Sequence, residues 1–269
     1  MSLAADRLAD LDAFLLELNR ASGEVILPLF RAEHGMVDKG ATAFDPVTEA
    51  DKGAERAIRT LIAERYPDHG VIGEEYGEDR PDAEFVWVLD PVDGTRAFIA
   101  GLPLWTTLIG LRFQGRPVLG SIGQPFLGEV FIGHAGASRL VTAAGEAPLR
   151  VRPCPKLTDA IIATTDPEMC FDGAELGAWT QVRAAARLAR LGCDAYAYAM
   201  VAQGTMDLVV EAGLKCWDVE AAIPVIEGAG GMVTNWRGQP IGTNGGQMAI
   251  AGDRACLDEA LVALKRSAK

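Results

Sequence analysis

The stretch Val86-Trp87-Val88-Leu89-Asp90-Pro91-Val92-Asp93-Gly94-Thr95 determines how the rest of the chain is interpreted. Its first four residues are apolar and rich in β-branched and aromatic types, which is typical of a buried strand. That strand runs directly into two carboxylates three positions apart, then a glycine and a hydroxyl. Pro91 fixes one backbone angle and Gly94 permits a close approach that a Cβ would hinder, so Asp90 and Asp93 can converge on one point.

Two interpretations of this acidic turn are open at this point. Hard cations such as Mg²⁺ take oxygen ligands from a few carboxylates and carbonyls and keep places for water and phosphate, so a metal site is one of them. The other is an ordinary Asp-Pro turn with a solvated rim, because Gly, Pro and Asp dominate turns. The stretch by itself favours neither.

The composition defines a globular, acidic protein. The chain has 269 residues, 49% apolar and 23% charged, which is long enough for one large domain or two of ordinary size. Its net charge of −12 argues against nucleic acid or an anionic membrane as the principal partner. An acidic protein that binds a phosphate needs local positive charge, which bound divalent cations would supply.

The cysteines and histidines argue against several kinds of site. The five cysteines are odd in number and form no Cys-x-x-Cys pair, so neither a disulfide framework nor a zinc cluster is favoured, and a reducing compartment fits best. We expect His34, His69 and His134 at the surface or in loops, so a metal site must be made of oxygen. An acidic start and the absence of a run of about 18 apolar residues predict a soluble, cytoplasmic protein.

The N-terminal region is predicted to hold two helices around a loop. Leucines at helical spacing from Leu8 onward predict an amphipathic helix that continues toward Phe30, followed by a loop over residues 32–47. The second helix begins after Thr48 and ends at Tyr66. Thr48 with an acid three residues later resembles a capping box, so Asp51 taken alone is more simply a capping residue than a catalytic one.

A second apolar strand, residues 71–73, also ends in carboxylates, Glu74 and Glu75. Adjacent acids repel one another unless cations or hydrogen bonds compensate, so two such strand ends in one region favour a functional site. After the turn at Asp90, short apolar runs separated by Gly and Pro over residues 106–132 predict an antiparallel meander.

The pattern changes near residue 150, where a segment rich in Gly and Pro separates two halves. We therefore predict an N-terminal α+β sub-domain, 1–150, and a C-terminal sub-domain, 151–269, in which strands and helices alternate as in α/β proteins. The second half carries another acidic cluster between Glu211 and Glu220. Within it, Asp218 stands where a helix N-cap belongs, and a carboxylate there can cap the helix or face a metal.

Together these segments resemble the Mg²⁺-dependent, lithium-sensitive phosphatase superfamily that includes the inositol monophosphatases. The motifs that carry the resemblance occur in the family's order: Thr-x-x-Asp at 48–51, Gly-Glu-Glu at 73–75, Asp-Pro-Val-Asp-Gly-Thr at 90–95 and Trp-Asp-Val at 217–219. The resemblance covers nearly the whole chain. It implies an α+β or α/β fold of the family's type, an alternating αβαβα layered sandwich of two sub-domains.

Carried over residue by residue, the resemblance implies roles for the acidic residues. Two or three Mg²⁺ ions would be held by Glu74, Asp90, the carbonyl of Val92, Asp93 and Asp218. Asp51 paired with Thr95 would orient or deprotonate a metal-activated water, with Glu74 also in the catalytic group, so catalysis and metal binding replace capping for Asp51 and Asp218. The candidate substrate-binding residues are Glu74, Val92, Asp93, Gly94, Thr95, Asp194, Glu211 and Asp218.

Within the superfamily, the sequence is most similar to the histidinol-phosphate phosphatase type. Four segments carry this similarity: residues 93–98, 103–111, 192–198 and 207–211. The expected reaction is hydrolysis of histidinol phosphate to histidinol and phosphate in histidine biosynthesis. Histidinol phosphate carries an ammonium and an imidazole, for which Asp194 and Glu211 are suitable counter-charges.

The alternatives keep the fold but change the function. Carboxylates also accept hydrogen bonds from sugar or inositol hydroxyls, so inositol 1-phosphate or another small sugar or nucleotide phosphate is the second candidate substrate. A catalytically silent metal- or phosphate-binding regulator is the third reading, disfavoured because every motif acid is present. The resemblance further implies a homodimer and sensitivity to lithium. We also expect loop 32–47 to close over the substrate, with Lys39 approaching a third metal.

Overall fold

The computed structural model describes residues 3–32, 37–38, 46–134 and 136–269. In this part of the chain, eight strands form an N-terminal sheet in the order β10-β9-β8-β7-β6-β5-β3-β4. β3 and β5 run parallel and the other neighbours are antiparallel. The strands are β3 Gly70–Gly73, β4 Gly77–Asp79, β5 Phe85–Asp93, β6 Thr106–Phe113, β7 Arg116–Gln124, β8 Glu129–His134, β9 Ala137–Thr142 and β10 Gly145–Pro148.

A second, C-terminal sheet has the order β12-β11-β13-β15-β14. β11 is parallel to β12 and to β13, whereas β15 is antiparallel to β13 and to β14. The strands are β11 Ile161–Thr164, β12 Leu188–Leu191, β13 Leu208–Leu214, β14 Met232–Thr234 and β15 Gly246–Ala251.

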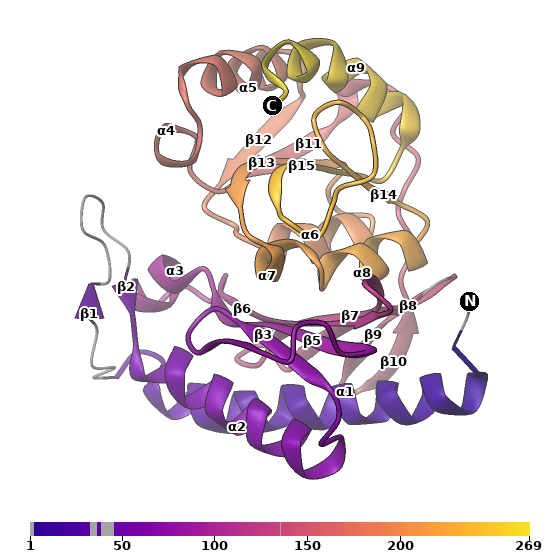
Figure 1. Cartoon of the computed structure of the whole chain (residues 1–269). Coiled ribbons are helices and arrows are strands. Elements are labelled where there is room, and N and C mark those ends of the chain that lie inside the picture. The colour runs from indigo at the N-terminus through magenta and orange to yellow at the C-terminus, as the bar shows by residue number, and fades with distance from the viewer. Residues whose placement is uncertain (1–2, 33–36, 39–45, 135) are drawn as a thin grey trace.

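Helices cover both sheets and also separate them, which produces the predicted αβαβα layers (Figure 1). α1 and α2 cover the outer face of the N-terminal sheet, α6, α7 and α8 lie between the sheets, and α5 and α9 cover the outer face of the C-terminal sheet. The helices are α1 Ala5–Ile26, α2 Glu49–Arg65, α3 Thr95–Ile99, α4 Pro167–Cys170, α5 Gly173–Ala185, α6 Tyr196–Ala202, α7 Cys216–Val219, α8 Ala222–Gly228 and α9 Arg254–Leu264.

β5 packs beneath α1 and α2 and contributes Trp87 and Leu89 to the buried cluster there. Because it has β3 on one side and β6 on the other, and because helices cover both faces of the sheet, its residues 85–89 are apolar without alternation. Trp87 is fully buried and packs edge-on against Phe14 of α1, with ring centroids 5.7 Å apart. The indole N–H of Trp87 donates to Nδ1 of His69 over 3.1 Å.

His69 lies in the loop between α2 and β3, one of the two places expected for the histidines. It is buried rather than at the surface, stacked between the rings of Tyr66 and Phe85 at 4.5 and 4.7 Å. Burial lowers the pKa of His69 to about 4, so its ring is neutral and accepts the proton of Trp87. It is a core histidine.

Residues 32–47 hold more structure than a loop. Val37–Asp38 (β1) and Pro46–Val47 (β2) pair as a short antiparallel ribbon, which the lack of an apolar period did not predict. The rest of the segment, including Lys39 and its expected approach to a metal, lies outside the described residues.

The two sheets share one core through the middle layer of helices. Leu108 and Phe131 from the N-terminal sheet and Val209 and Ile250 from the C-terminal sheet belong to one buried cluster around α6 and α8. The strands of the two sheets nevertheless fall on either side of the predicted division at residue 150. We propose the division as one of topology, with the two sub-domains sharing this core.

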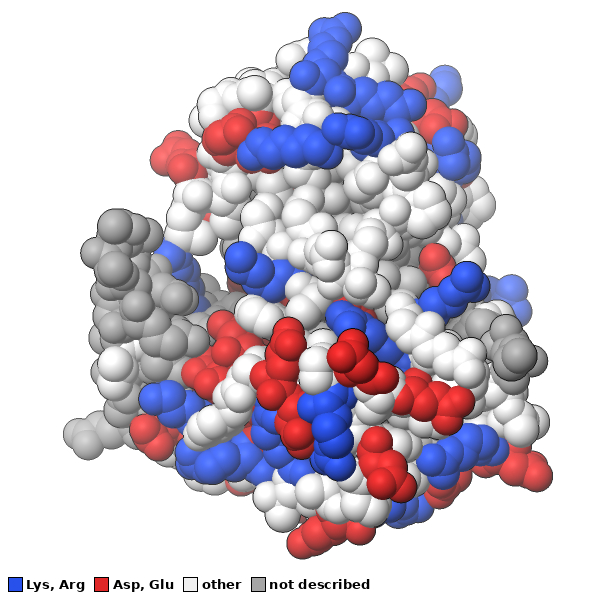
Figure 2. Space-filling view, in the orientation of Figure 1, with Lys and Arg blue, Asp and Glu red and all other residues white. Residues whose placement is uncertain are grey.

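Charged side chains mix on the surface. On the face shown in Figure 2, acidic and basic residues are interspersed over the lower half of the molecule. Among the described residues, no helix combines the length and the apolar character that crossing a membrane requires.

Candidate active site

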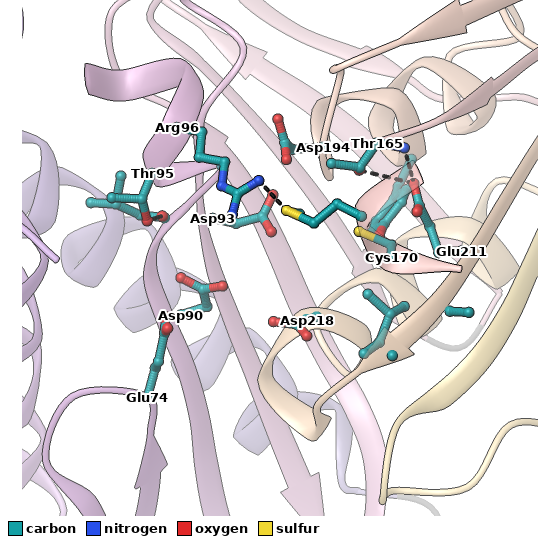
Figure 3. Close-up of a pocket in the computed structure, with 17 residues that line it drawn as sticks. Glu74, Asp90, Asp93, Thr95, Arg96, Thr165, Cys170, Asp194, Glu211 and Asp218 are labelled. Carbon is teal, nitrogen blue, oxygen red and sulfur yellow. Dashed lines mark hydrogen bonds between the residues drawn. The ribbon is translucent and has the colours of Figure 1, made fainter. Parts of the chain in front are cut away.

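The carboxyl ends of β3 and β5 bring the first acids together. The two strands are parallel and Gly73 is opposite Leu89, so the next residues along each strand, Glu74 and Asp90, leave the sheet at the same edge. Figure 3 shows the carboxyl group of Glu74 directed toward Asp90. The register of β5 with β6 shifts between Asp90 and Asp93, and this irregularity turns both carboxylates into the site.

Asp218 reaches this point from the other half of the chain. Carboxylate oxygens of Asp90, Asp93 and Asp218 lie within 4.8 Å of one another. Our placement of Asp218 at the N-cap is wrong by three residues, because α7 begins at Cys216 after an N-cap at Lys215. Asp218 still caps the helix: its Oδ2 accepts the backbone N–H of Lys215 over 2.6 Å, which leaves its other oxygen for the site.

The electrostatics of this cluster are unfavourable without a cation. Asp90 is 3% exposed, and no group among the described residues donates a hydrogen bond to its Oδ1. Burial, with repulsion from neighbouring carboxylates, raises the pKa of Asp90 and of Asp93 well above the usual range. Burial also raises the pKa of Asp218 to about 6. A buried carboxylate oxygen without a donor, surrounded by further acids, fits a divalent cation, whose charge and oxygen preference satisfy both needs.

Asp51 and Thr95 form a second part of the site, and the capping and catalytic roles prove compatible. Oδ2 of Asp51 accepts from the backbone N–H and the hydroxyl of Thr48, at 2.8 and 2.5 Å, which completes the capping box of α2. Oδ1 of Asp51 lies 3.4 Å from the Thr95 hydroxyl, which also lies 3.1 Å from the carbonyl of Val92. The Asp51 carboxylate therefore caps α2 with Oδ2 and contacts the Thr95 hydroxyl with Oδ1.

Gly94 occupies the turn between β5 and α3. Its φ of +80° lies in the left-handed region, and a Cβ at this position would be 3.0 Å from the carboxyl carbon of Asp194. Glycine is therefore required both by the backbone and by the acid packed against it. The helix α3 that begins at Thr95 has only five residues.

The pocket in front of these residues has a volume of about 340 Å³, at the small end of the range for ligand sites. Asp194 lines it in a left-handed conformation with φ of +45°, which is uncommon for a residue other than glycine. The next residue, Ala195, donates its N–H to Oδ2 of Asp93 over 2.7 Å. The turn at Asp194 thus joins the second half of the chain to the motif on β5.

Glu211 closes the opposite wall of the pocket, at the carboxyl end of the parallel pair β11 and β13. It is 2% exposed and accepts hydrogen bonds from the hydroxyls of Thr164 and Thr165, at 3.2 and 3.0 Å, and from the Thr165 N–H at 2.9 Å. Burial raises the pKa of Glu211 to about 8. Burial also raises the pKa of Asp194 to about 6, although the Arg96 guanidinium opposes that shift. At neutral pH and without cations, Asp194 carries the charge and Glu211 is mostly protonated.

Several pocket residues were not singled out as functional by the sequence. Arg96 follows the β5 motif directly and contacts Met169 of α4, so it crosses the mouth of the pocket between the two halves (Figure 3). Thr165 follows an apolar strand and is recognisable only from its contact with Glu211. Thr165 belongs to no motif, whereas Arg96 lies within the segment 93–98 that carries the similarity to the histidinol-phosphate phosphatases. Further lining residues outside our predictions are Met169, Cys170, Tyr198, Ala212, Gly213 and Leu214.

The comparisons with known proteins agree with this chemistry. A family model described as the inositol monophosphatase family matches residues 7–268. The chain is 46% identical over 221 residues to the chloroplastic bifunctional phosphatase IMPL2 of Arabidopsis thaliana, a match that covers 81% of this chain and 62%, less than two thirds, of that protein. It is 35% identical to a histidinol-phosphatase of Chlorobaculum parvum, over 72% of this chain and 74% of that one.

A solved structure of an inositol monophosphatase from Zymomonas mobilis superposes with a TM-score of 0.86 at 37% identity, covering 98% of this chain and 100% of that one. The fold and the cluster of acids are of the inositol monophosphatase type. The chain belongs to the inositol monophosphatase family, as the sequence motifs predicted. Relatives carry the names histidinol-phosphatase and inositol-1-monophosphatase alike, so family membership does not decide between these substrates.

Proposed function

We propose that this protein is a Mg²⁺-dependent phosphomonoesterase that hydrolyses histidinol phosphate to histidinol and phosphate. The observation that carries the proposal is Asp194, a charged carboxylate that lines the pocket beside the β5 motif in an uncommon backbone conformation. It adds negative charge to the pocket beyond the proposed metal ligands. Such a charge suits a substrate that carries a cation as well as a phosphate.

Two or three Mg²⁺ ions would be held by Glu74, Asp90, the Val92 carbonyl, Asp93 and Asp218. When bound, these ions would neutralise the phosphoryl oxygens and make water a usable nucleophile near neutral pH. Asp51 and Thr95 orient or deprotonate the attacking water: when Thr95 donates to Oδ1 of Asp51, its oxygen lone pairs can accept a hydrogen bond from water, and a proton that passes from water to Thr95 is balanced by transfer of the Thr95 proton to Asp51. The hydrogen bonds on Oδ2 fix the carboxylate while it does so.

Asp194 and Glu211 have different roles in this proposal. Asp194 is ionised at neutral pH, so it pairs with the ammonium or the protonated imidazole of the substrate. Glu211, with its pKa near 8, ionises when the cationic group of the substrate lies beside it, because a nearby positive charge favours the carboxylate form. Its contacts with Thr164 and Thr165 hold it in place in both forms.

The test is phosphate release with Mg²⁺, comparing histidinol phosphate with inositol 1-phosphate by the ratio of kcat/KM values. We expect a preference for histidinol phosphate that falls roughly 10- to 100-fold in Asp194→Asn, the magnitude of one charge-assisted hydrogen bond. The matched control is Glu168→Gln, which removes an exposed charge from α4 without touching the pocket. A preference for inositol 1-phosphate in the unmodified protein would overturn the substrate assignment.

Inositol 1-phosphate is the second candidate substrate, because Thr165 and Glu211 together present a hydroxyl and a carboxyl that bind substrate hydroxyls equally well. Another small sugar or nucleotide phosphate would be accommodated by the same groups. In this case Asp194→Asn would lower kcat/KM no more than Glu168→Gln does. Absence of phosphate release from the whole panel would instead favour the third reading, a silent metal- or phosphate-binding regulator.

The assembly and location that we propose, a cytoplasmic homodimer, rest on the family resemblance and on the composition. Light scattering of the purified protein tests the dimer, and a mass corresponding to one chain of 28.6 kDa would reject it. Lithium inhibition at sub-millimolar concentration would place the enzyme nearer to the inositol phosphatases than to the histidinol type.

A further inference from the structure

A buried ion pair outside the pocket joins the two halves of the molecule beside the site. Nε of Arg112, on β6, donates to Oε2 of Glu220 over 2.5 Å, and a second guanidinium nitrogen donates to Oε1. The Glu220 side chain is 1% exposed and the Arg112 side chain 14%. The pair is bidentate, so it fixes an angle as well as a distance.

Glu220 lies two residues after Asp218, directly beyond the last residue of α7. This short helix has little stability of its own and takes its position from what it rests on. Cys216 and Trp217 pack on the apolar cluster of β3 and β5. Beneath the end of α7, the sheet presents two glycines, Gly110 and Gly120. A Cβ at Gly110 would lie 3.1 Å from the backbone nitrogen of Ala221, and one at Gly120 only 2.2 Å from its carbonyl oxygen. The backbone after Asp218 is therefore seated directly on β6 and β7.

Stability alone does not explain such a pair. Removing two charges from water costs about as much as their attraction returns, and replacing a buried ion pair with apolar side chains of similar volume is often neutral or stabilising. What a bidentate pair adds is a fixed position. The group whose position it fixes is α7, the element that delivers Asp218 to Asp90 and Asp93 from the other half of the chain.

We propose that Arg112 and Glu220 are positioning residues that hold Asp218 at the geometry required for metal binding. The inference rests on the proposed metal site and adds to it two residues outside the pocket. Because the effect is transmitted through α7, it should appear as weaker metal binding by a protein that is still folded. Changes in outer contacts of this kind typically cost about 10- to 100-fold in metal affinity.

The test measures Mn²⁺ binding by calorimetry together with the melting temperature. We expect the double variant Arg112→Met/Glu220→Met to bind Mn²⁺ about 10- to 100-fold more weakly, while its melting temperature stays within a few degrees of the unmodified protein. The milder Glu220→Gln, which keeps the volume and one acceptor, should give a smaller loss in the same direction and serves if the double variant does not fold.

A matched control is Arg152→Met/Asp207→Asn. Arg152 and Asp207 form an equally bidentate pair in which Asp207 is fully buried, but the contacts of this pair lie at the opposite end of β11 from Glu211, at Ile161. This variant should lower the melting temperature and leave Mn²⁺ affinity unchanged. Equal losses of affinity in the control would show a general structural effect and overturn the proposal.

The decisive measurement introduces the double substitution into a protein that already carries Asp218→Asn. If Arg112 and Glu220 act through Asp218, the double variant should weaken Mn²⁺ binding little further once Asp218 is already neutral, whereas independent effects would add. Additivity, or wild-type affinity in the folded double variant, would reject the positioning role. If the unmodified protein bound no Mn²⁺, or bound it unchanged in Asp93→Asn, the proposed metal site itself would fail, and the inference with it.

Discussion

The end of β5 and the helix α7 supply carboxylates to one site in different ways. Asp90 and Asp93 are three positions apart on one strand, and the pairing of β5 with β3 and β6 fixes them. Asp218 lies much later in the sequence, after β13. Its position depends on packing, on glycine contacts and on an ion pair. The first pair is encoded by a short motif, whereas the third acid depends on the tertiary structure.

The largest effect that we expect is the loss of catalysis in Asp93→Asn. If the acids of β5 hold the catalytic cations, removing one should cost several kcal/mol of transition-state stabilisation, a fall in kcat of about 10³-fold or more. The melting temperature of the metal-free protein should not fall, because the substitution removes a buried carboxyl group whose charged form is disfavoured by burial and by neighbouring acids.

Phosphate release and thermal unfolding of the same preparation measure both quantities. Val92→Ala is the control on the same strand, because it leaves the backbone carbonyl and the carboxylates in place and trims a buried side chain. It should lower stability more than activity. Near-normal turnover by Asp93→Asn would break the comparison, since the end of β5 would then not hold the catalytic cations.

The next effect concerns the close contact between β7 and the backbone that follows α7. The methyl group of Gly120→Ala would lie only 2.2 Å from the present position of the Ala221 carbonyl oxygen. Overpacking of this kind costs about 1–3 kcal/mol, and the shift should carry Asp218 away from the other acids and weaken Mn²⁺ binding. Unfolding by urea and Mn²⁺ calorimetry measure the two effects.

Gly177→Ala is the matched control for this substitution. Gly177 lies inside α5 with nothing near the position of a new Cβ, so alanine should stabilise the protein by about 0.5–1 kcal/mol and leave Mn²⁺ binding unchanged. If Gly120→Ala lost stability without losing metal affinity, the position of α7 would tolerate displacement, and the contrast between the two regions would weaken.

The same contrast explains what could be predicted from the sequence. The strand that ends at Asp90, the helix that begins after Thr48 and the alternating second half follow from periodicity and from turn and capping residues, which are local signals. The αβαβα layers and the convergence of distant acids came from the family resemblance, because spacing along the chain does not specify which segments meet.

The features that the sequence did not reveal are those that depend on tertiary contacts. His69 carries no local sign that it stacks between Tyr66 and Phe85, and Arg112 reads as an ordinary solvated charge until Glu220 is placed beside it. The left-handed turn at Asp194 was also invisible, since aspartate is compatible with many conformations. Arg112 and Glu220 are 108 residues apart and Phe85 reaches His69 from β5, so only the folded structure brings these partners together.

A smaller effect concerns the pH dependence of stability. Burial raises the pKa of Asp90, Asp93, Asp194, Asp218 and Glu211, to about 6 for Asp194 and Asp218 and about 8 for Glu211. The folded, metal-free protein therefore keeps protons that the unfolded chain releases near pH 4. Their contribution to stability is complete below about pH 4 and is lost as the pH rises toward 8, with a slope of at most about 1.4 kcal/mol per pH unit for each group.

Mg²⁺ and Glu211→Gln separate two contributions to this pH dependence, that of the proposed metal ligands and that of Glu211. Mg²⁺ should remove the part due to Asp90, Asp93 and Asp218, because a bound cation stabilises their charged forms. It should leave much of the part due to Glu211, whose hydrogen-bond partners are Thr164 and Thr165. Glu211→Gln should remove the remaining slope between pH 6 and 8, as measured by urea unfolding at each pH with and without Mg²⁺. If Mg²⁺ left the whole slope unchanged, the acids of β5 and α7 would not share a cation, and the end of β5 would be an ordinary acidic turn.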